Sequence, residues 1–289
     1  MQLITGTTKL LGVIGNPIAH SLSPVMHNAA IAQLNSNYVY LPLPVEPANL
    51  KTAIAGFEAI GLVGFSITIP HKQNIIPLLS QISEEASLVG AVNTVWRGDS
   101  GWCGTNTDVE GFLAPLKEIK RDWSKIRAIV LGNGGAARAV VVGLDRAGCR
   151  DICVFGRDTE RLRSFQENWQ NSRIKKAVKV FTMAELDDLV SDAEICINCT
   201  PVGMYPRTDF TPISAETLAR FPANFIAYDL VYNPRPTKFL KIAAEKGAIA
   251  IDGLEMLVQQ GAAALKIWLQ REDVPVDIMR RSLLDNLGL

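Results

Sequence analysis

The segment that most constrains the fold is an apolar run that leads through a glycine-rich turn into a helical pattern. Residues 127–131 read RAIVL and residues 132–146 read GNGGAARAVVVGLDR. Together they match the G-x-G-x-x-G/A fingerprint in the strand, turn and helix context that it requires, with Ala137 in the third position. Gly132 permits the tight turn, Gly134 lets the backbone approach a pyrophosphate, and the helix N-terminus offers unpaired N–H groups to phosphates. The segment therefore predicts a Rossmann-type dinucleotide-binding domain.

The end of the next strand is where such a domain distinguishes NAD from NADP. Residues 154–161 read VFGRDTER, so Arg157 and Arg161 are placed to face a 2′-phosphate, a contact that is charge-assisted and often bidentate. The structural alternative for Arg161 is a solvated helix residue. Asp158 is ambiguous, because its carboxylate either pairs with an arginine or receives a ribose hydroxyl. We expect NADP to be favoured over NAD.

The whole chain alternates short apolar runs, bounded by Gly or Pro, with helical patterns, which is typical of βαβ units and a mostly parallel sheet. We therefore predict an α/β protein, and 289 residues favour two domains. Strands are expected near residues 9–14, 38–45, 64–69, 91–97, 127–131, 152–155, 178–181, 194–198, 225–230 and 248–251. Helices are expected near residues 25–34, 50–60, 75–79, 84–89, 109–119, 139–146, 254–270 and 276–286.

The domain boundary is predicted where a second α/β series starts abruptly at residue 127, after the helix at 109–119. The helical tail is expected to pack back on the first series. We therefore assign residues 1–108 and 253–289 to a substrate-binding and catalytic domain. Residues 109–252 form the predicted NADP-binding, Rossmann-like domain.

Composition excludes several classes of partner. The chain carries 29 basic and 29 acidic side chains, so its net charge is zero and gives no reason to expect binding to nucleic acid or to a membrane surface. We expect no signal peptide and no membrane span, because the start lacks a basic segment followed by a long apolar one. Five cysteines argue for a reducing compartment, and we expect a cytoplasmic protein. Cys196 and Cys199 resemble a metal half-site, but nothing completes it, so we expect no metal.

Polar side chains in the first domain gather where predicted strands end. They are Ser21, Ser23, Thr68, Lys72, Asn93 and Asp108. Ligands of α/β sheets bind outside the carboxyl ends of strands, so these side chains can converge on one crevice. Each has a structural alternative. Ser23 and Asp108 are candidate helix N-caps. Asn93 is suited to satisfy buried backbone groups, and Lys72 to remain a solvated lysine.

Seven sequence blocks, in order, resemble shikimate dehydrogenase, of the shikimate/quinate dehydrogenase family, over nearly the whole chain. They are GNPIAHSLSP at residues 15–24, TIPHK at 68–72, GAVNT at 90–94, NTD at 106–108, GNGGA at 132–136, NCTPVGM at 198–204 and DGLEMLVQQ at 252–260. The resemblance implies an active site in the cleft between an N-terminal substrate domain and the Rossmann-type domain. It also implies a small-molecule substrate, and we leave a homodimer open.

The resemblance also implies individual roles. Lys72 and Asp108 would be the catalytic pair and would also contact the substrate. Ser21, Ser23 and Tyr232 would hold the substrate carboxylate. The ring hydroxyls would meet Thr68, Asn93, Asp108 and Gln260. NADP would be bound by Gly132, Asn133, Gly134, Gly135, Ala136, Arg157, Arg161, Thr200, Val231, Gly253 and Met256.

The implied reaction is the reversible reduction of 3-dehydroshikimate to shikimate by NADPH, in the biosynthesis of chorismate and aromatic amino acids. One departure concerns the cofactor: the family commonly has Asn-Arg-Thr where this chain has Gly156, Arg157 and Asp158. This keeps an NAD-preferring quinate/shikimate dehydrogenase open. A regulatory binding protein of the same fold without catalysis is the alternative outside enzymes, although it would not need both Lys72 and Asp108.

Overall fold

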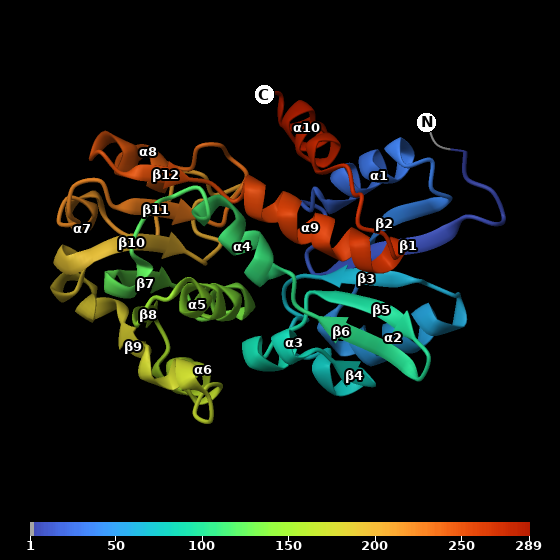
Figure 1. Cartoon of the computed structure of the whole chain (residues 1–289), viewed down its shortest axis with the longest axis horizontal. Coiled ribbons are helices and arrows are strands. Elements are labelled where there is room, and N and C mark those ends of the chain that lie inside the picture. The colour runs from blue at the N-terminus through green and yellow to red at the C-terminus, as the bar shows by residue number, and fades with distance from the viewer. Residues whose placement is uncertain (1–2) are drawn as a thin grey trace. The chain divides into compact units, whose positions relative to one another are not determined.

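The computed structural model describes residues 3–289 and divides the chain into two compact units (Figure 1). Among the described residues, unit 1 comprises residues 3–111 and Val258–Leu289, and unit 2 comprises Phe112–Leu257. The sequence placed the divisions after residue 108 and before residue 253. Each unit has its own six-stranded sheet, and the predicted α/β class is confirmed.

The sheet of unit 1 is mixed and has the strand order β2-β1-β3-β5-β6-β4. Its strands are β1 (Lys9–Gly15), β2 (Tyr38–Pro44), β3 (Gly64–Ile67), β4 (Gln81–Ile82), β5 (Thr94–Gly98) and β6 (Gly101–Thr105). β1 runs parallel to β2 and β3, whereas β5 is antiparallel to both β3 and β6. The end of β3, the start of β5 and the end of β6 therefore lie at one edge of this sheet.

Helices and short 3₁₀ turns complete unit 1. They are α1 (Ser23–Gln33), α2 (Leu50–Ala59), α3 (Glu84–Val89) and α10 (Val276–Leu287), with η1 (Pro47–Asn49) and η2 (Ile76–Leu78). α1 packs against β2 and α10. Phe65 of β3 is completely buried and meets the ring of Trp102 edge-on at 5.2 Å, in the core between the sheet and α2. Two other helices, α4 (Asp108–Leu116) and α9 (Leu254–Leu269), contain residues of both units.

The sheet of unit 2 has the strand order β12-β11-β10-β7-β8-β9 and is parallel throughout. Its strands are β7 (Arg127–Leu131), β8 (Asp151–Gly156), β9 (Val178–Thr182), β10 (Ala193–Asn198), β11 (Ile226–Asp229) and β12 (Ile249–Ile251). Counted along the chain, this is the 3-2-1-4-5-6 order of the Rossmann fold. The order reverses between β7 and β10, whose neighbouring carboxyl ends are the usual ligand position.

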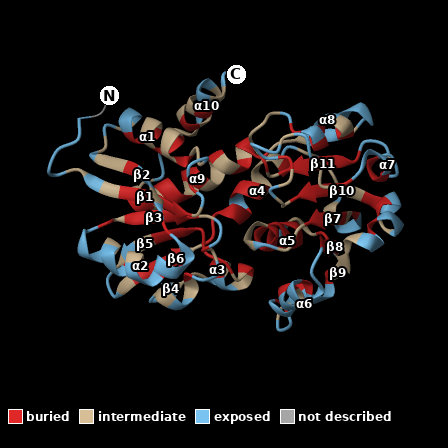
Figure 2. Cartoon of the chain, turned by 180° about the vertical axis from the view of Figure 1, so that it is seen from behind, coloured by how far each residue is buried: buried red, intermediate tan, exposed pale blue. Residues whose placement is uncertain are grey.

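Helices and 3₁₀ turns connect the strands of unit 2. They are α5 (Gly135–Ala147), α6 (Thr159–Glu167), α7 (Ala215–Leu218) and α8 (Lys238–Glu245), with η3 (Trp123–Lys125), η4 (Arg173–Lys176), η5 (Met183–Asp188) and η6 (Val190–Asp192). The central strands β7, β10 and β11 are almost entirely buried (Figure 2). Continuous apolar strands of this kind are expected where helices cover both faces of a parallel sheet.

Some elements differ from the sequence-based expectation. β6 reads GWCGT and was not predicted, because two glycines hide its apolar alternation and its pairing with β5 is non-local. The interpretation of Ser23 as an N-cap is wrong. α1 begins at Ser23 itself, Leu22 is the N-cap residue, and no side chain caps this helix. Within residues 3–289, no helix has the length and apolarity that crossing a bilayer requires.

A buried histidine lies in the core of unit 1. The ring of His27, on α1, is fully buried and stacks on Tyr40 at 4.3 Å between ring centroids. Within the described chain neither ring nitrogen has a hydrogen-bond partner. Desolvation therefore penalises the charged form and lowers the pKa of His27 from 6.5 to about 3. The imidazole is neutral in the folded protein at neutral pH.

We predict that His27 makes the protein less stable in mild acid. In the unfolded chain His27 is protonated below about pH 6.5, whereas in the folded chain it stays neutral down to about pH 3. Stability therefore falls as the pH drops through this window. Between pH 7 and pH 5 the loss from this group is about 2 kcal/mol. Urea unfolding of the wild type and of His27→Leu at both pH values measures it. An identical pH dependence in the two proteins would contradict the prediction.

Candidate active site

A lysine and an aspartate from distant parts of unit 1 form a largely buried ion pair. Lys72 follows β3 and Asp108 is the first residue of α4. The Nζ atom of Lys72 donates to Oδ2 of Asp108 at 2.5 Å, and the two side chains are 17% and 7% exposed. Lys72 is therefore not a solvated surface lysine. Removing either partner would leave the other charge poorly compensated.

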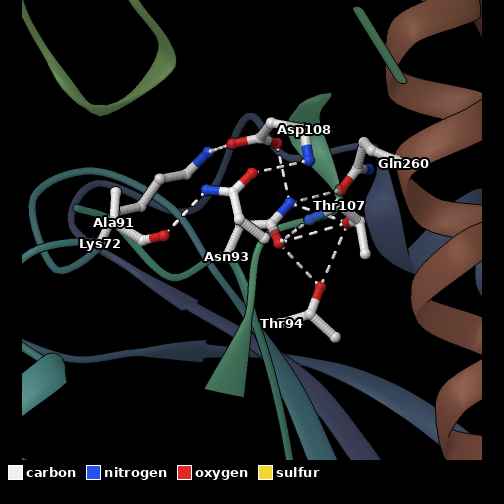
Figure 3. Close-up of polar contacts among 8 residues, drawn as sticks. Lys72, Ala91, Asn93, Thr94, Thr107, Asp108 and Gln260 are labelled. Carbon is white, nitrogen blue, oxygen red and sulfur yellow. Dashed lines mark hydrogen bonds and ion pairs between the residues drawn. The ribbon is translucent and has the colours of Figure 1, made fainter. Parts of the chain in front are cut away.

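Asn93 holds the aspartate of this pair in place (Figure 3). Its Nδ2 atom donates to Oδ1 of Asp108 at 2.8 Å and to Oε1 of Gln260 at 3.3 Å. Its Oδ1 atom accepts from the backbone N–H of Thr107 at 2.8 Å. Asn93 thus fixes the carboxylate and also satisfies a buried backbone N–H group, as its structural interpretation predicted. Its contact with a substrate hydroxyl stays a prediction.

Two further residues of this network were not assigned a role from the sequence. The Nδ2 atom of Asn106 donates to the backbone oxygen of Ala91 at 2.9 Å, and its Oδ1 atom accepts from the backbone N–H of Asp108 at 3.0 Å. Thr107 accepts from Asn93 through its hydroxyl at 2.9 Å. These bonds fix the segment before α4. The short polar run that precedes a helix was the available signal, but its partners lie elsewhere in the chain.

The remaining substrate candidates of unit 1 lie on neighbouring segments. Ser21 and Ser23 come between β1 and the first turn of α1, where the hydroxyl of Ser21 accepts from the backbone N–H of Ser23 at 3.3 Å. Thr68 follows β3 directly and is half-buried. Because β1 and β3 are parallel, these residues share the sheet edge at which β5 starts. Tyr232, the other candidate, belongs to unit 2 and follows β11.

The glycine-rich turn of unit 2 fits a dinucleotide. Gly132 has φ +105° and donates its N–H to the oxygen of Phe155 at 2.8 Å, which seats the turn beside the end of β8. Gly134 is the N-cap residue of α5 and no side chain caps that helix, so the first N–H groups stay open for phosphate. A Cβ atom on Gly134 would meet nothing within 4 Å. Gly135 and Ala136 begin the helix.

The other predicted cofactor residues also lie in unit 2. Thr200 follows β10 and donates through its hydroxyl to Oδ1 of Asn198 at 2.7 Å. Val231 follows β11, and its oxygen accepts from the N–H of Gly253 at 3.2 Å. Gly253 lies so close to Leu230 that a Cβ atom there would lie 2.1 Å from the Leu230 oxygen. Met256 lies in the first turns of α9.

The segment after β8 gives Asp158 a structural role. The carboxylate of Asp158 caps α6 by accepting from the backbone N–H of Arg161 at 3.1 Å. The guanidinium of Arg161 is 3.8 Å from the same carboxylate, and its side chain is 81% exposed. Arg157 is exposed immediately after the strand. The capping role of Asp158 was readable from its position before a helical segment.

A buried carboxylate organises the loops that follow β10 and β11. Asp229 accepts from Nδ2 of Asn198 at 2.9 Å, from the N–H of Val231 at 3.0 Å and from the hydroxyl of Thr237 at 2.7 Å. Its burial raises the pKa of Asp229 to about 6, although these hydrogen bonds act in the opposite direction. The carboxylate therefore links three segments near the predicted cofactor residues Thr200 and Val231.

Cys196 lies in β10 and Cys199 follows that strand directly. Burial raises the pKa of the Cys196 and Cys199 thiols, which keeps both protonated. Across residues 3–289, no group of three or more His, Cys, Asp or Glu side chains is arranged to hold a metal ion.

These features define a class of protein: a two-unit α/β protein with a Rossmann-type dinucleotide-binding unit and a lysine–aspartate pair in the other unit. Three family models match the chain. They are the shikimate dehydrogenase substrate-binding domain at residues 13–95, the shikimate/quinate 5-dehydrogenase domain at residues 115–205 and the shikimate 5′-dehydrogenase C-terminal domain at residues 253–284. The chain belongs to the shikimate dehydrogenase family, as its sequence blocks predicted.

Individual relatives agree over full length. A protein of Gloeothece citriformis, named shikimate dehydrogenase (NADP⁺), is 60% identical, and the match covers 100% of both chains. A solved shikimate dehydrogenase in complex with NADP⁺ has 39% identity and a TM-score of 0.87, covering 99% of this chain and 98% of the other. The enzyme of Listeria monocytogenes, solved with shikimate and NAD, has 36% identity and a TM-score of 0.84, covering 98% and 99%.

We predict that Asp229 lowers stability as the pH rises. The unfolded carboxyl loses its proton near pH 3.8 and the folded one near pH 6, so the folded state binds the proton better and loses that advantage across this window. The Asp229→Asn variant lacks the titration. Its free energy of unfolding, relative to wild type, should rise by about 2 kcal/mol between pH 4 and pH 7. Urea unfolding at both pH values measures this difference, and a constant difference would refute the role of Asp229.

Proposed function

We propose that this chain catalyses the reversible, NADP-dependent interconversion of 3-dehydroshikimate and shikimate, with Lys72 and Asp108 as its catalytic pair. The observation that carries the proposal is the buried contact between these two side chains at 2.5 Å, in a chain whose second unit has the Rossmann strand order. The names of the full-length relatives support the same substrate and cofactor.

The lysine supplies what ketone reduction needs from the protein. The chemistry that NADPH would supply when bound is a hydride for the ketone carbon. Negative charge then develops on the ketone oxygen, and the ammonium of Lys72 stabilises it and donates a proton to it. In the reverse direction the neutral amine that this transfer leaves on Lys72 takes the hydroxyl proton. Asp108 orients the ammonium, and Asn93 in turn orients Asp108 through the 2.8 Å bond. Gln260 is held by the same amide at 3.3 Å.

The substrate contacts follow from the sheet edge described above. We propose that the ring hydroxyls meet Thr68, Asn93, Asp108 and Gln260, beside the reacting oxygen at Lys72. The hydroxyls of Ser21 and Ser23, together with Tyr232, would bind the carboxylate. Ser23 is only 8% exposed, and its backbone N–H is bound by the hydroxyl of Ser21 at 3.3 Å.

The cofactor residues proposed for unit 2 follow its strand ends. Gly132, Gly134 and the start of α5 would hold the pyrophosphate, because that turn offers open N–H groups and free space. Arg157 and Arg161 would face the 2′-phosphate. Loops after β10 and β11, with the start of α9, would line the remainder of the dinucleotide. The proposed set there is Thr200, Val231, Gly253 and Met256.

A single assay separates this proposal from its alternatives. Steady-state rates with shikimate and with quinate, each against NADP⁺ and NAD⁺, should give the largest kcat/KM for shikimate with NADP⁺. An NAD-preferring quinate/shikimate dehydrogenase would give the largest value with NAD⁺. A regulatory binding protein would give no absorbance change from reduced nicotinamide in any combination.

We further propose a cytoplasmic protein, which its free cysteines support, because Cys103, Cys149, Cys153, Cys196 and Cys199 all lack disulfides. A homodimer stays a prediction. Sedimentation of the purified chain tests it.

We predict that Lys72→Ala lowers kcat by about 10²–10⁴-fold, because it removes the proton donor, while the substrate still binds. Steady-state kinetics with shikimate and NADP⁺ measures the loss, and thermal unfolding checks that the variant folds. Lys51→Ala, which removes an exposed lysine of α2, is the matched control and should keep the wild-type kcat. An unchanged kcat in Lys72→Ala would remove this lysine from catalysis.

We predict that Arg157→Ala weakens the use of NADPH much more than that of NADH, because the exposed guanidinium pairs with the 2′-phosphate. The loss in kcat/KM for NADPH should exceed that for NADH by about 10-fold or more. Arg163→Ala is the control, since Arg163 lies on α6 in an exposed pair with Glu160. Equal losses with both cofactors would show that Arg157 does not read the phosphate.

A further inference from the structure

The side-chain amide of Asn133 is a buried donor without a partner. Among the described residues of unit 2, its Nδ2 atom is the only buried side-chain nitrogen or oxygen that lacks a hydrogen bond. Leaving such a group unsatisfied costs free energy, and orphaned polar atoms in folded proteins call for a specific explanation. A ligand that accepts a hydrogen bond would supply one.

The position of this amide is set by two glycines. Gly132, with φ +105°, turns the chain beside the end of β8. Gly156, the last residue of β8, has no side chain, and a Cβ atom there would lie 3.3 Å from Nδ2 of Asn133 and 2.9 Å from Cδ2 of Leu162. The amide of Asn133 therefore occupies the space above the end of β8 that a side chain at position 156 would crowd.

The two residues that follow Gly156 are an arginine and an aspartate. Arg157 is exposed. One carboxylate oxygen of Asp158 caps α6 by accepting from the N–H of Arg161 at 3.1 Å. A ribose 2′-hydroxyl is normally bound by an acidic acceptor in this place, whereas a 2′-phosphate is bound by donors. The arrangement favours the phosphate.

The geometry points to Asn133 as a residue that selects NADP, through a hydrogen bond from its Nδ2 atom to the 2′-phosphate of the adenosine ribose. This inference rests on the proposed NADP-binding function and deepens it, because it assigns the phosphate contact to a side chain of the glycine-rich turn as well as to Arg157. An NH₂ group offers two hydrogens, and a phosphate offers three acceptor oxygens.

The test changes the charge of the side chain at position 133 while its size stays the same. Asn133→Asp keeps the size of the side chain but replaces the donor by a negative group, and Asn133→Ala removes the donor alone. Calorimetric binding to the whole protein is measured with adenosine 2′,5′-bisphosphate, which carries the 2′-phosphate, and with 5′-AMP, which lacks it. Asn171→Asp, at an exposed position after α6, introduces the same charge elsewhere in unit 2 and is the matched control.

We expect Asn133→Asp to raise the Kd for the bisphosphate by about 10-fold or more, because like charges then meet, and to change that for 5′-AMP by less than about threefold. Asn133→Ala should raise the Kd for the bisphosphate by about 3- to 10-fold. If thermal unfolding shows that Asn133→Asp is not folded, the result for Asn133→Ala decides the test. Asn171→Asp should bind both ligands as the wild type does.

Two outcomes would overturn different claims. If the wild type prefers the bisphosphate but the Asn133 variants weaken both ligands equally, Asn133 does not read the phosphate and the proposed NADP function stands. If the wild type binds the two ligands equally, the NADP preference itself is refuted, and the role of Asn133 with it. Ratios of kcat/KM for NADP⁺ and NAD⁺ in the same variants give a second readout.

Discussion

The amide of Asn93 is the interaction on which the geometry of unit 1 depends. One side chain binds the carboxylate of Asp108, the side chain of Gln260 and the backbone of Thr107. These partners come from α4, from α9 and from the segment that joins β6 to α4. Because both ends of the amide are engaged, Asp108 has little freedom to turn away from Lys72. Fixed orientation of this kind lets an ion pair serve proton transfer instead of stability alone.

The sheet of unit 2 provides the comparable constraint for the cofactor. Its parallel strands bring their carboxyl ends to one edge, and the order reverses between β7 and β10. The turn at Gly132 and the loop at Thr200 follow those two strands, so a Cβ atom on Gly132 would lie 3.0 Å from Cγ2 of Thr200. Asp229 fixes the adjacent loops through its hydrogen bonds. Burial raises the pKa of this carboxyl group and so makes it harder to ionise.

Much of the fold and part of the candidate site could be predicted from the sequence, for physical reasons that differ from region to region. The fingerprint from Gly132 onward was predicted because a turn, a strand and a helix are local, and their patterns are short-range. Lys72 and Asp108 were candidates because they lie where predicted strands end, but their pairing came from the resemblance, since 36 residues separate them and no periodicity connects them. Asn106 was missed because its partner, the oxygen of Ala91, is defined only by the fold. Ser23 was misread as a cap because Pro24 follows it, although the helix already begins at Ser23.

The close approach of Asn133 to Gly156 has a consequence for how this chain can vary. A side chain gained at position 156 would meet the amide of Asn133 and the methyl groups of Leu162 at once. A change at either position thus alters which residues the other tolerates, and their effects on stability would not add. A larger residue at the end of β8 therefore calls for a shorter or redirected side chain at position 133, which couples the composition of the glycine-rich turn to that of the neighbouring strand.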